Sequence, residues 1–242
     1  MALPKIDVPV YEMIVPSTGK TVKVRPFSVK EEKLLLIALE SKDQLEIVNT
    51  VKQVVNNCLV YGEFDVDRSP FFDVDFLFIY LRAKSMGENV GVKLTCNNVL
   101  EDGEKCGKIF AADMDLNNVE VIKDDTIDND ISLGGDKGVV MKYPGYGVMK
   151  KIVDSALDID RKVSLVVNSI DYIYDKDGTY SSKDHSKEEL NDFVMQLTEE
   201  NFRKMERFVD NFPTFAVKLE ASCPKCGFNH KVRYTDFADF FL

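Results

Sequence analysis

Apolar and polar residues alternate near the start of the chain, as they do in a β-strand with one buried face. Residues 8–15 are mostly apolar and β-prone, and residues 21–25 alternate. The sequence Pro16-Ser17-Thr18-Gly19 between them has the composition of a turn, and Pro26 ends the second run. The pattern therefore predicts a β-hairpin over residues 8–26.

A helical period replaces the alternation after this hairpin. Ser28 followed three residues later by Glu31 has the sequence of a capping box, which marks a helix start before a leucine-rich run. Apolar residues three or four positions apart predict a second helix over residues 43–60. A third helix is expected over residues 73–85, after which the β-type alternation returns.

The second half of the chain repeats the plan of the first half. The matching segments keep their order, and they are residues 20–26 and 137–144, 54–60 and 166–172, and 91–95 and 216–220. The last segment of each half leads directly into a pair of cysteines. We therefore expect an α+β fold of two similar halves, residues 1–117 and 118–242, each with a β-hairpin, helices and a cysteine-bearing β-hairpin. Generic α+β patterning shared by chance is the alternative.

A polar stretch, residues 175–185, interrupts the second half. Its Asp-x-Asp-Gly sequence resembles a calcium loop, but the first and twelfth ligand positions fall on Ile173 and Asp184, which do not suit that site. A β-turn or short hairpin is the better interpretation. Ser186 and Thr198 then predict the starts of two further helices.

Composition limits the partners that the protein can have. The chain has 242 residues, 45% of them hydrophobic, and a formal net charge of −10. This charge repels phosphate backbones, so nucleic acid is a poor default partner. We see no basic apolar leader, and the apolar run at residues 76–81 is too short to cross a bilayer. We therefore expect neither secretion nor a membrane partner.

Five cysteines supply the candidate chemistry. Cys223-x-x-Cys226-Gly227 between two β-type runs is typical of a zinc knuckle, because its turn can direct two thiolates at one ion. Cys96 and Cys106 are the candidates for the other two ligands, although nine residues separate them. Four thiolates would close the coordination sphere of a structural zinc. Cys58 lies in an apolar run and is expected to be a buried thiol.

His230 is the competing zinc ligand, because it follows Cys226 closely in sequence. A histidine early in a strand is more often a surface residue, so we favour four sulfurs. Whether His230 replaces one cysteine stays open at this point. The closed site would form a zinc-ribbon-like junction between the two halves.

Catalytic motifs are missing from the sequence. It contains two histidines and lacks a nucleophile elbow, a phosphate loop and a dinucleotide fingerprint. The glycine-rich residues 133–138 lack the spacing of a phosphate cradle, and we expect them to form a hairpin turn. We expect that the protein is not an enzyme. The alternatives are a zinc-ribbon nucleic-acid-binding or transcription-associated factor, and a metalloenzyme with an open zinc site.

The last quarter of the chain carries a family resemblance. A helix beginning Ser186-Lys187-Glu188-Glu189-Leu190 is followed by a second helix that ends before Pro213, a strand into Cys223-x-x-Cys226, and a closing Asp239-Phe240-Phe241. In this order the sequence resembles the baseplate hub assembly proteins of T4-type contractile-tailed phages. The likeness is strongest over residues 184–242, and the N-terminal half matches only in its plan.

The resemblance implies a structural or assembly protein of the tail baseplate hub, located in the virion tail or in the host cytoplasm during assembly. Its partners would be other hub or tail proteins, with a homo-oligomer as one option. No catalytic residue carries over. The apolar residues in 234–242 are a candidate contact surface, and packing against their own domain is the alternative. Whether the protein stays in the mature virion, and in how many copies, is left open.

Overall fold

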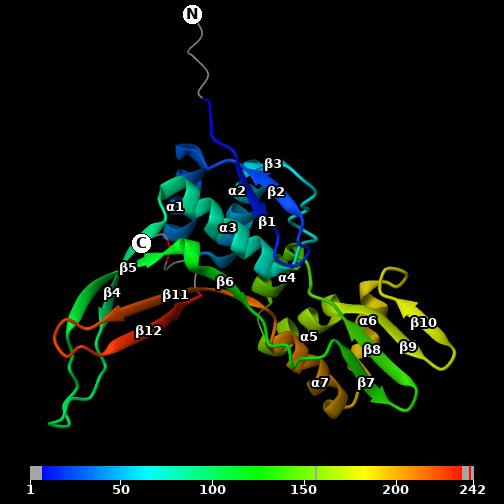
Figure 1. Ribbon diagram of the computed structural model, residues 1–242. Helices are drawn as coiled ribbons and strands as arrows, with labels where there is room; N and C mark the ends of the chain where they lie inside the picture. The colour runs from blue at the N-terminus through cyan, green and yellow to red at the C-terminus, as the bar shows by residue number, and fades with distance from the viewer. Residues whose placement is uncertain (1–6, 156, 236–239, 241–242) are drawn as a thin grey trace, which may run out of the picture.

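Three lobes make up the computed structural model, which describes residues 7–155, 157–235 and 240 (Figure 1). The predicted α+β class is confirmed: the described residues form seven α-helices and several small antiparallel sheets. None of the helices in these residues is both long and apolar enough to cross a membrane.

The first lobe combines a three-stranded sheet with three helices. The predicted hairpin and helices are present, and Glu31 occupies the capping-box position after Ser28. The strands are ordered β1-β2-β3. The elements of this lobe are β1 (Tyr11–Ile14), β2 (Thr21–Val24), α1 (Val29–Ser41), α2 (Gln44–Cys58), β3 (Leu59–Tyr61) and α3 (Phe71–Met86).

The predicted second helix is too long by two residues. Helix α2 ends at Cys58, and the chain passes directly into strand β3, which pairs antiparallel with β2. The helical period of the apolar residues continues through this point, but Val60 and Tyr61 are β-prone and the edge of β2 is available to them. Tertiary pairing therefore overrides the local helical pattern.

The second lobe has a four-stranded sheet, ordered β10-β9-β8-β7, and four helices. The polar stretch 175–185 begins with the turn of the β9–β10 hairpin, as expected. The hydroxyl of Ser186 accepts a hydrogen bond from the N–H of Glu189 at 3.1 Å, which confirms the predicted helix start. The elements are β7 (Asp130–Gly134), β8 (Lys137–Met141), α4 (Met149–Asp154), α5 (Asp158–Ser169), β9 (Ile170–Asp175), β10 (Gly178–Ser181), α6 (Lys187–Met195) and α7 (Glu199–Asp210).

The sheets of the first two lobes share one pairing geometry. In the first, β2 and β3 pair through Val24–Leu59, and in the second, β8 and β9 pair through Met141–Ile170. Each ladder shifts register by one residue immediately before these pairs. The backbone N–H of the residue after β2 or β8 then donates to the carbonyl of the last residue of the helix that leads into β3 or β9: Arg25 to Cys58 at 2.9 Å and Lys142 to Ser169 at 2.7 Å.

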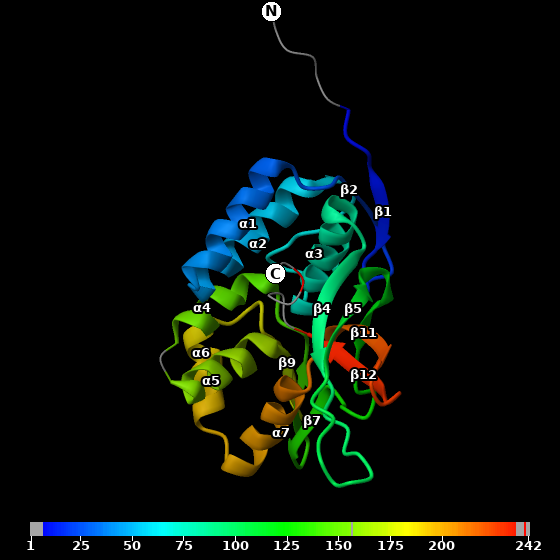
Figure 2. The ribbon, with the colours of Figure 1, turned by 90° about the vertical axis from the view of Figure 1, so that its left-hand side faces the viewer.

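The third lobe is built from both halves of the chain. Its hairpin β4–β5 lies beside the sheet β12-β11-β6, as Figures 1 and 2 both show. The two predicted cysteine-bearing hairpins are β4–β5 and β11–β12. The elements are β4 (Asn89–Thr95), β5 (Ile109–Asp115), β6 (Val119–Ile122), β11 (Thr214–Ser222) and β12 (Asn229–Tyr234).

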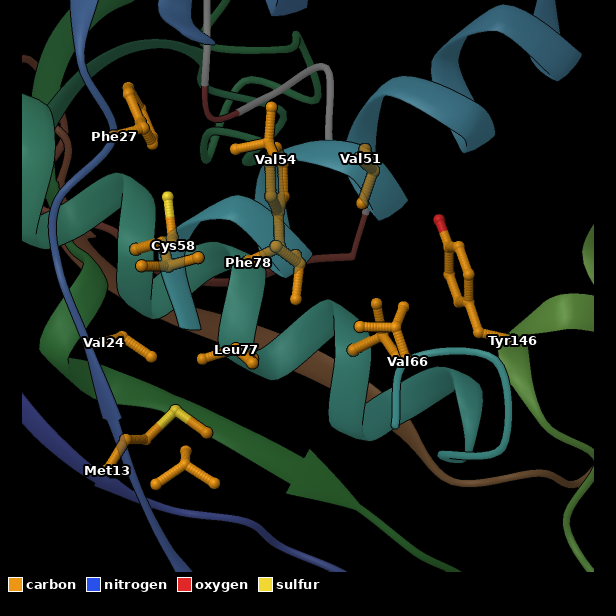
Figure 3. Close-up of a cluster of buried hydrophobic side chains, with 14 of the residues drawn as sticks. Met13, Val24, Phe27, Val51, Val54, Cys58, Val66, Leu77, Phe78 and Tyr146 are labelled. Carbon is orange, nitrogen blue, oxygen red and sulfur yellow. The ribbon is translucent and has the colours of Figure 1, made fainter. Parts of the chain in front are cut away.

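Each lobe has its own hydrophobic core. The core of the first lobe includes Cys58, which is fully buried as expected, and also Tyr146 from the second half of the chain (Figure 3). The core of the second lobe is confined to residues 127–212. The core of the third lobe joins Ile79 and Met114 of the first half to Phe215 and Phe240 of the second. The two halves are therefore interleaved in the third lobe.

Phe240, near the C-terminus, packs back on its own chain. Its side chain is fully buried in the core of the third lobe, and its carbonyl accepts a hydrogen bond from Nε of Arg82 at 2.8 Å. The other large apolar residues of the proposed terminal contact surface, Phe237, Phe241 and Leu242, lie outside the described residues.

Candidate metal centre

Two turns at one end of the third lobe bring the four predicted cysteines together. Cys96 directly follows β4 and Cys106 precedes β5, whereas Cys223 and Cys226 lie in the turn between β11 and β12. Their sulfur atoms all lie within 4.8 Å of one another. The first three cysteines are buried and Cys226 is half-buried. Sequence reasoning therefore selected all four members of this group.

The two turns share one hydrogen-bond frame. The N–H of Cys223 donates to the carbonyl of Phe228 at 2.9 Å, and the N–H of Gly227 donates back to Cys223 at 2.9 Å. The longer turn repeats both bonds, from Cys96 to the carbonyl of Lys108 at 2.8 Å and from Gly107 to Cys96 at 3.0 Å. Both glycines have positive φ, 73° and 62°, which a residue without Cβ adopts at little cost.

The nine residues between Cys96 and Cys106 do not disturb this frame, because the extra residues form a small hairpin of their own. The N–H of Leu100 donates to Glu104 at 2.8 Å, and Val99 and Lys105 form a β-bridge. The N–H of Cys106 donates to the carbonyl of Asn98 at 2.8 Å, and this bond closes the extra hairpin so that Cys106 lies near Cys96. The length of the loop, which weakened the sequence prediction, is therefore compatible with a four-cysteine site.

Each close sulfur pair contains one cysteine from each turn. Sγ of Cys96 lies 3.6 Å from Sγ of Cys226, and Sγ of Cys106 lies 3.9 Å from Sγ of Cys223. The four atoms therefore form a compact group with one pair from each half of the chain. Such a group of sulfur donors could hold a metal ion.

The surroundings favour a thiolate at Cys226. The backbone N–H of Phe228 lowers the pKa of Cys226 to about 6, with Cys96 and the side-chain amide of Asn98 acting in the same direction against burial. Nδ2 of Asn98 lies 3.7 Å from the Cys226 sulfur. Burial raises the pKa of Cys96 to about 12. In the absence of a cation, negative charge would therefore collect on Cys226 first.

A lysine lies at the edge of the cluster. Nζ of Lys225, between the two cysteines of the short turn, donates to the carbonyl of Cys106 at 3.2 Å. This contact ties the short turn to the long one. It also places a positive charge beside a group of sulfurs that would be negative when bound to a divalent ion.

His230 does not belong to the cluster, and the expectation that it is a surface residue is wrong. Its side chain is buried, and its ring packs against Phe228 and Phe110 at centroid distances of 4.9 and 5.7 Å. Nε2 is buried without a hydrogen-bond partner. The alternation of β12 contains the missed signal, because Asn229 and Lys231 on either side of His230 are exposed.

Other candidates offer little chemistry. The glycine-rich residues 133–138 turn between β7 and β8, as expected. His185 lies at the surface just before α6, with Nδ1 3.8 Å from a carboxylate oxygen of Glu189. A groove of about 720 Å³ between α5, α6 and α7 is lined by neither histidine nor cysteine. Its Lys187 has a lowered pKa because burial and the nearby Lys142 and Lys151 disfavour its charge.

A comparison with known families adds one finding. The family model described as "T4 bacteriophage base plate protein" matches residues 8–242. Neither a curated protein nor a solved structure matches the chain. The match includes the four cysteines and all three lobes, and it extends far beyond residues 184–242, where the sequence resemblance is strongest.

Proposed function

Because the chain belongs to the T4 bacteriophage base plate protein family, we propose that it acts in the hub of a contractile-tail baseplate as a structural or assembly protein. The observation that carries this proposal is the family match over residues 8–242. Membership in the family implies a phage baseplate protein that contacts other tail or baseplate proteins. The hub location, the choice between a resident and a transient role, and homo-oligomer formation belong to the proposal.

One structural zinc, in our proposal, joins Cys96, Cys106, Cys223 and Cys226. Tetrahedral coordination with Zn–S bonds of about 2.3 Å requires sulfur atoms about 3.8 Å apart. The two close sulfur pairs, at 3.6 and 3.9 Å, have this spacing. Four protein thiolates leave no open position for water or substrate, which supports a stabilising role and not a catalytic one.

The proposal also treats the chain as two similar halves, residues 1–117 and 118–242, that share one metal. The common register shift and the matching backbone hydrogen bonds of Arg25 and Lys142 support this view. Each half supplies one cysteine turn with the same hydrogen-bond frame. The third lobe, where the halves interleave, is the junction that the metal would hold.

A nucleic-acid-binding role has little support in the surroundings of the cysteine turns. Nζ of Lys225 is directed to a backbone carbonyl, and Lys231 pairs with Glu220 at 3.1 Å. Lys218 pairs with Glu120 at 2.6 Å. These lysines are partnered within the chain, and the net charge of −10 opposes binding to phosphate backbones.

The hub proposal is tested by locating the protein during infection. Baseplates and assembly intermediates purified from infected cells are separated by sedimentation, and their proteins are identified by mass spectrometry. We expect the protein in the hub-containing fractions, either in mature baseplates or only in intermediates. If it sediments with neither, the proposed function is wrong.

Metal content tests the zinc proposal. We expect one zinc per chain in the parent and a loss of nearly all of it when any one of the four clustered cysteines is changed to serine, because a three-sulfur site is incomplete. Cys58→Ala is the matched control, since Cys58 is buried in another lobe. Stoichiometry would be measured by elemental mass spectrometry. Unchanged zinc in both Cys96→Ser and Cys106→Ser would contradict the four-sulfur site.

A further inference from the structure

The outer edge of strand β3 has no neighbouring strand in the part of the chain that the structure describes. The first sheet ends at β3, whereas in the second sheet the strand in the corresponding position, β9, pairs with one more strand, β10 (Figure 1). An exposed strand edge can pair with a strand from another chain, and proteins usually cover or charge such edges. In the first lobe this edge is therefore uncovered, whereas in the second lobe strand β10 covers the corresponding edge of β9.

The strand pairing sets the correspondence between β3 and β9, and it shifts the sequence match of residues 54–60 with 166–172 by one residue. Tyr61 pairs with the residue of β2 just before the register shift, and Tyr172 does the same with β8. Val60 and Asp171 are the residues that the shift leaves between the pairs. The same residue type, tyrosine, thus occupies the same place in both sheets.

In the second lobe the added strand covers this place. Ser181 of β10 pairs with Tyr172, and the N–H of Ser182 donates to the carbonyl of Asp171 at 2.9 Å. Tyr172 is accordingly half-buried. In the first lobe Tyr61 is 73% exposed and Val60 is 53% exposed. Two adjacent apolar side chains of this size gain free energy if a partner buries them.

The edges of β3 and β9 differ in charge at one position, and this difference indicates which kind of partner residue fits the β3 edge. In the second lobe Nζ of Lys142 joins Asp171 and the hydroxyl of Ser182, each at 3.1 Å. In the first lobe the equivalent of Lys142 is Arg25, which is engaged by Glu31, and Val60 replaces Asp171. An ionic anchor is therefore replaced by an apolar side chain, so an uncharged, apolar partner residue is the complementary one.

We infer that the β3 edge is a docking site for a short extended segment of a neighbouring baseplate protein. The segment pairs antiparallel with Tyr61 as a fourth strand, donates a backbone N–H to the carbonyl of Val60, and carries an uncharged apolar residue against the Val60 side chain. Backbone hydrogen bonds supply affinity in this mode of recognition, and side chains supply selectivity. The inference rests on the proposed function, because it takes the partner from the baseplate.

Edge charges provide the test. Val60→Lys and Tyr61→Lys place an ammonium on the edge while leaving the pairing with β2 available, since both side chains are exposed. Ile14→Lys is the matched control, because Ile14 is 63% exposed in the same sheet but on the opposite edge strand. We expect each β3 variant to reduce the protein recovered in sedimenting baseplate complexes about tenfold, which corresponds to a modest binding loss. The control is expected to match the parent.

A second measurement needs no variant. Hydrogen exchange of the complex should show slower exchange of the backbone amides of residues 59–62 than in the free protein. If the parent joins the baseplate but the β3 variants join equally well and these amides stay unprotected, the edge inference is overturned while the proposed function stands. If the parent joins no baseplate complex, both are overturned. The melting temperature of each β3 variant would be measured as well. If a variant is destabilised, hydrogen exchange of residues 59–62 in the complex of the parent protein decides whether the β3 edge is the docking site.

Discussion

An ion pair between a buried carboxylate and a half-buried arginine illustrates how single residues support the first lobe. The carboxylate of Glu31, which is 5% exposed, accepts hydrogen bonds from Arg25 at 2.8 and 3.0 Å and from the N–H of Ser28 at 2.6 Å. The Arg25 side chain is the main cause that lowers the pKa of Glu31 to about 2, against a penalty from burial. One carboxylate thus closes the capping box of α1 and fixes the arginine that follows β2.

This pKa predicts how stability depends on acidity. Because the pKa of Glu31 is lower in the folded protein than its ordinary value of 4.5, its contribution is complete above pH 4.5 and is lost as pH falls toward 2. Glu31→Gln should cost up to about 3 kcal/mol at pH 7 and flatten the loss of stability between pH 4.5 and 2. Urea unfolding at several pH values measures both effects.

Glu63→Gln is the control for that prediction. Glu63 also pairs with a lysine, Lys20, at 2.8 Å, but its side chain is 87% exposed, so its removal should be nearly neutral. Equal unfolding midpoints for Glu31→Gln and the parent at pH 7 would contradict the role given to Glu31.

At the residue scale, sequence reasoning succeeded where chemistry is local. The cysteine turns and the buried thiol of Cys58, whose pKa burial raises to about 12, follow from residue type and neighbours. His230 was misjudged although the alternation of β12 places it on the buried face, next to Phe228. Its second aromatic neighbour, Phe110, belongs to the other half of the chain and cannot be identified from the sequence near the histidine.

At the scale of elements, the repeating patterns located most helices and strands but not the end of α2. The apolar spacing is the same on both sides of Cys58, and only pairing with β2 converts residues 59–61 to a strand. For the long loop between Cys96 and Cys106, the sequence suggested a departure from a knuckle that the structure does not have. Its extra residues form a hairpin that leaves the hydrogen bonds of the knuckle unchanged. Element boundaries depended on pairing partners that are distant in sequence.

The join between the first two lobes depends on close backbone approach at Gly145. Gly145 forms a β-bridge with Pro70, and the next residue, Tyr146, donates to the carbonyl of Ser69 at 2.8 Å. A Cβ on Gly145 would clash with the carbonyl of Asp67 and would lie 2.8 Å from Cα of Arg68. Both obstacles are backbone atoms, which cannot move aside as a flexible side chain can.

Gly145→Ala should therefore destabilise the protein by about 3 kcal/mol, the upper part of the usual range for overpacking. Gly178→Ala is the matched control, because no atom lies within 4 Å of its added Cβ and its φ is not in the left-handed region. Thermal unfolding followed by circular dichroism would compare the two. Similar melting temperatures for Gly145→Ala and Gly178→Ala would show that the chain relaxes at this join.

At the scale of the whole molecule, three cores divide the chain differently from its two sequence halves. The first two cores lie mostly within one half each, but the third is shared by α3, β4, β5 and β11. The expectation of two similar halves placed the two cysteine pairs at one junction, and the four cysteines do lie together. It could not predict the interleaving, because that depends on contacts between side chains such as Met114 and Phe215 that are distant in sequence.

The proposed metal should consequently stabilise one lobe more than the others. Treatment with a chelator is expected to increase amide exchange in β4, β5, β11 and β12 strongly, because their cysteine turns lose the metal ion that joins them. Exchange in α6 and α7 should change little, since their core is separate. Hydrogen exchange with mass spectrometry, with and without zinc added back, measures this pattern. A uniform increase over all three lobes would contradict a local role.

The shared cysteine cluster also has a mechanical consequence. If the four sulfurs hold an ion, the shortest covalent route from the first lobe to β12 runs from Cys96 through the metal to Cys226. The chain between Gly107 and Ser222, which carries the second lobe, then forms a closed loop outside that route. Tension applied between the first lobe and β12 would then pass through the metal and not through the helices of the second lobe.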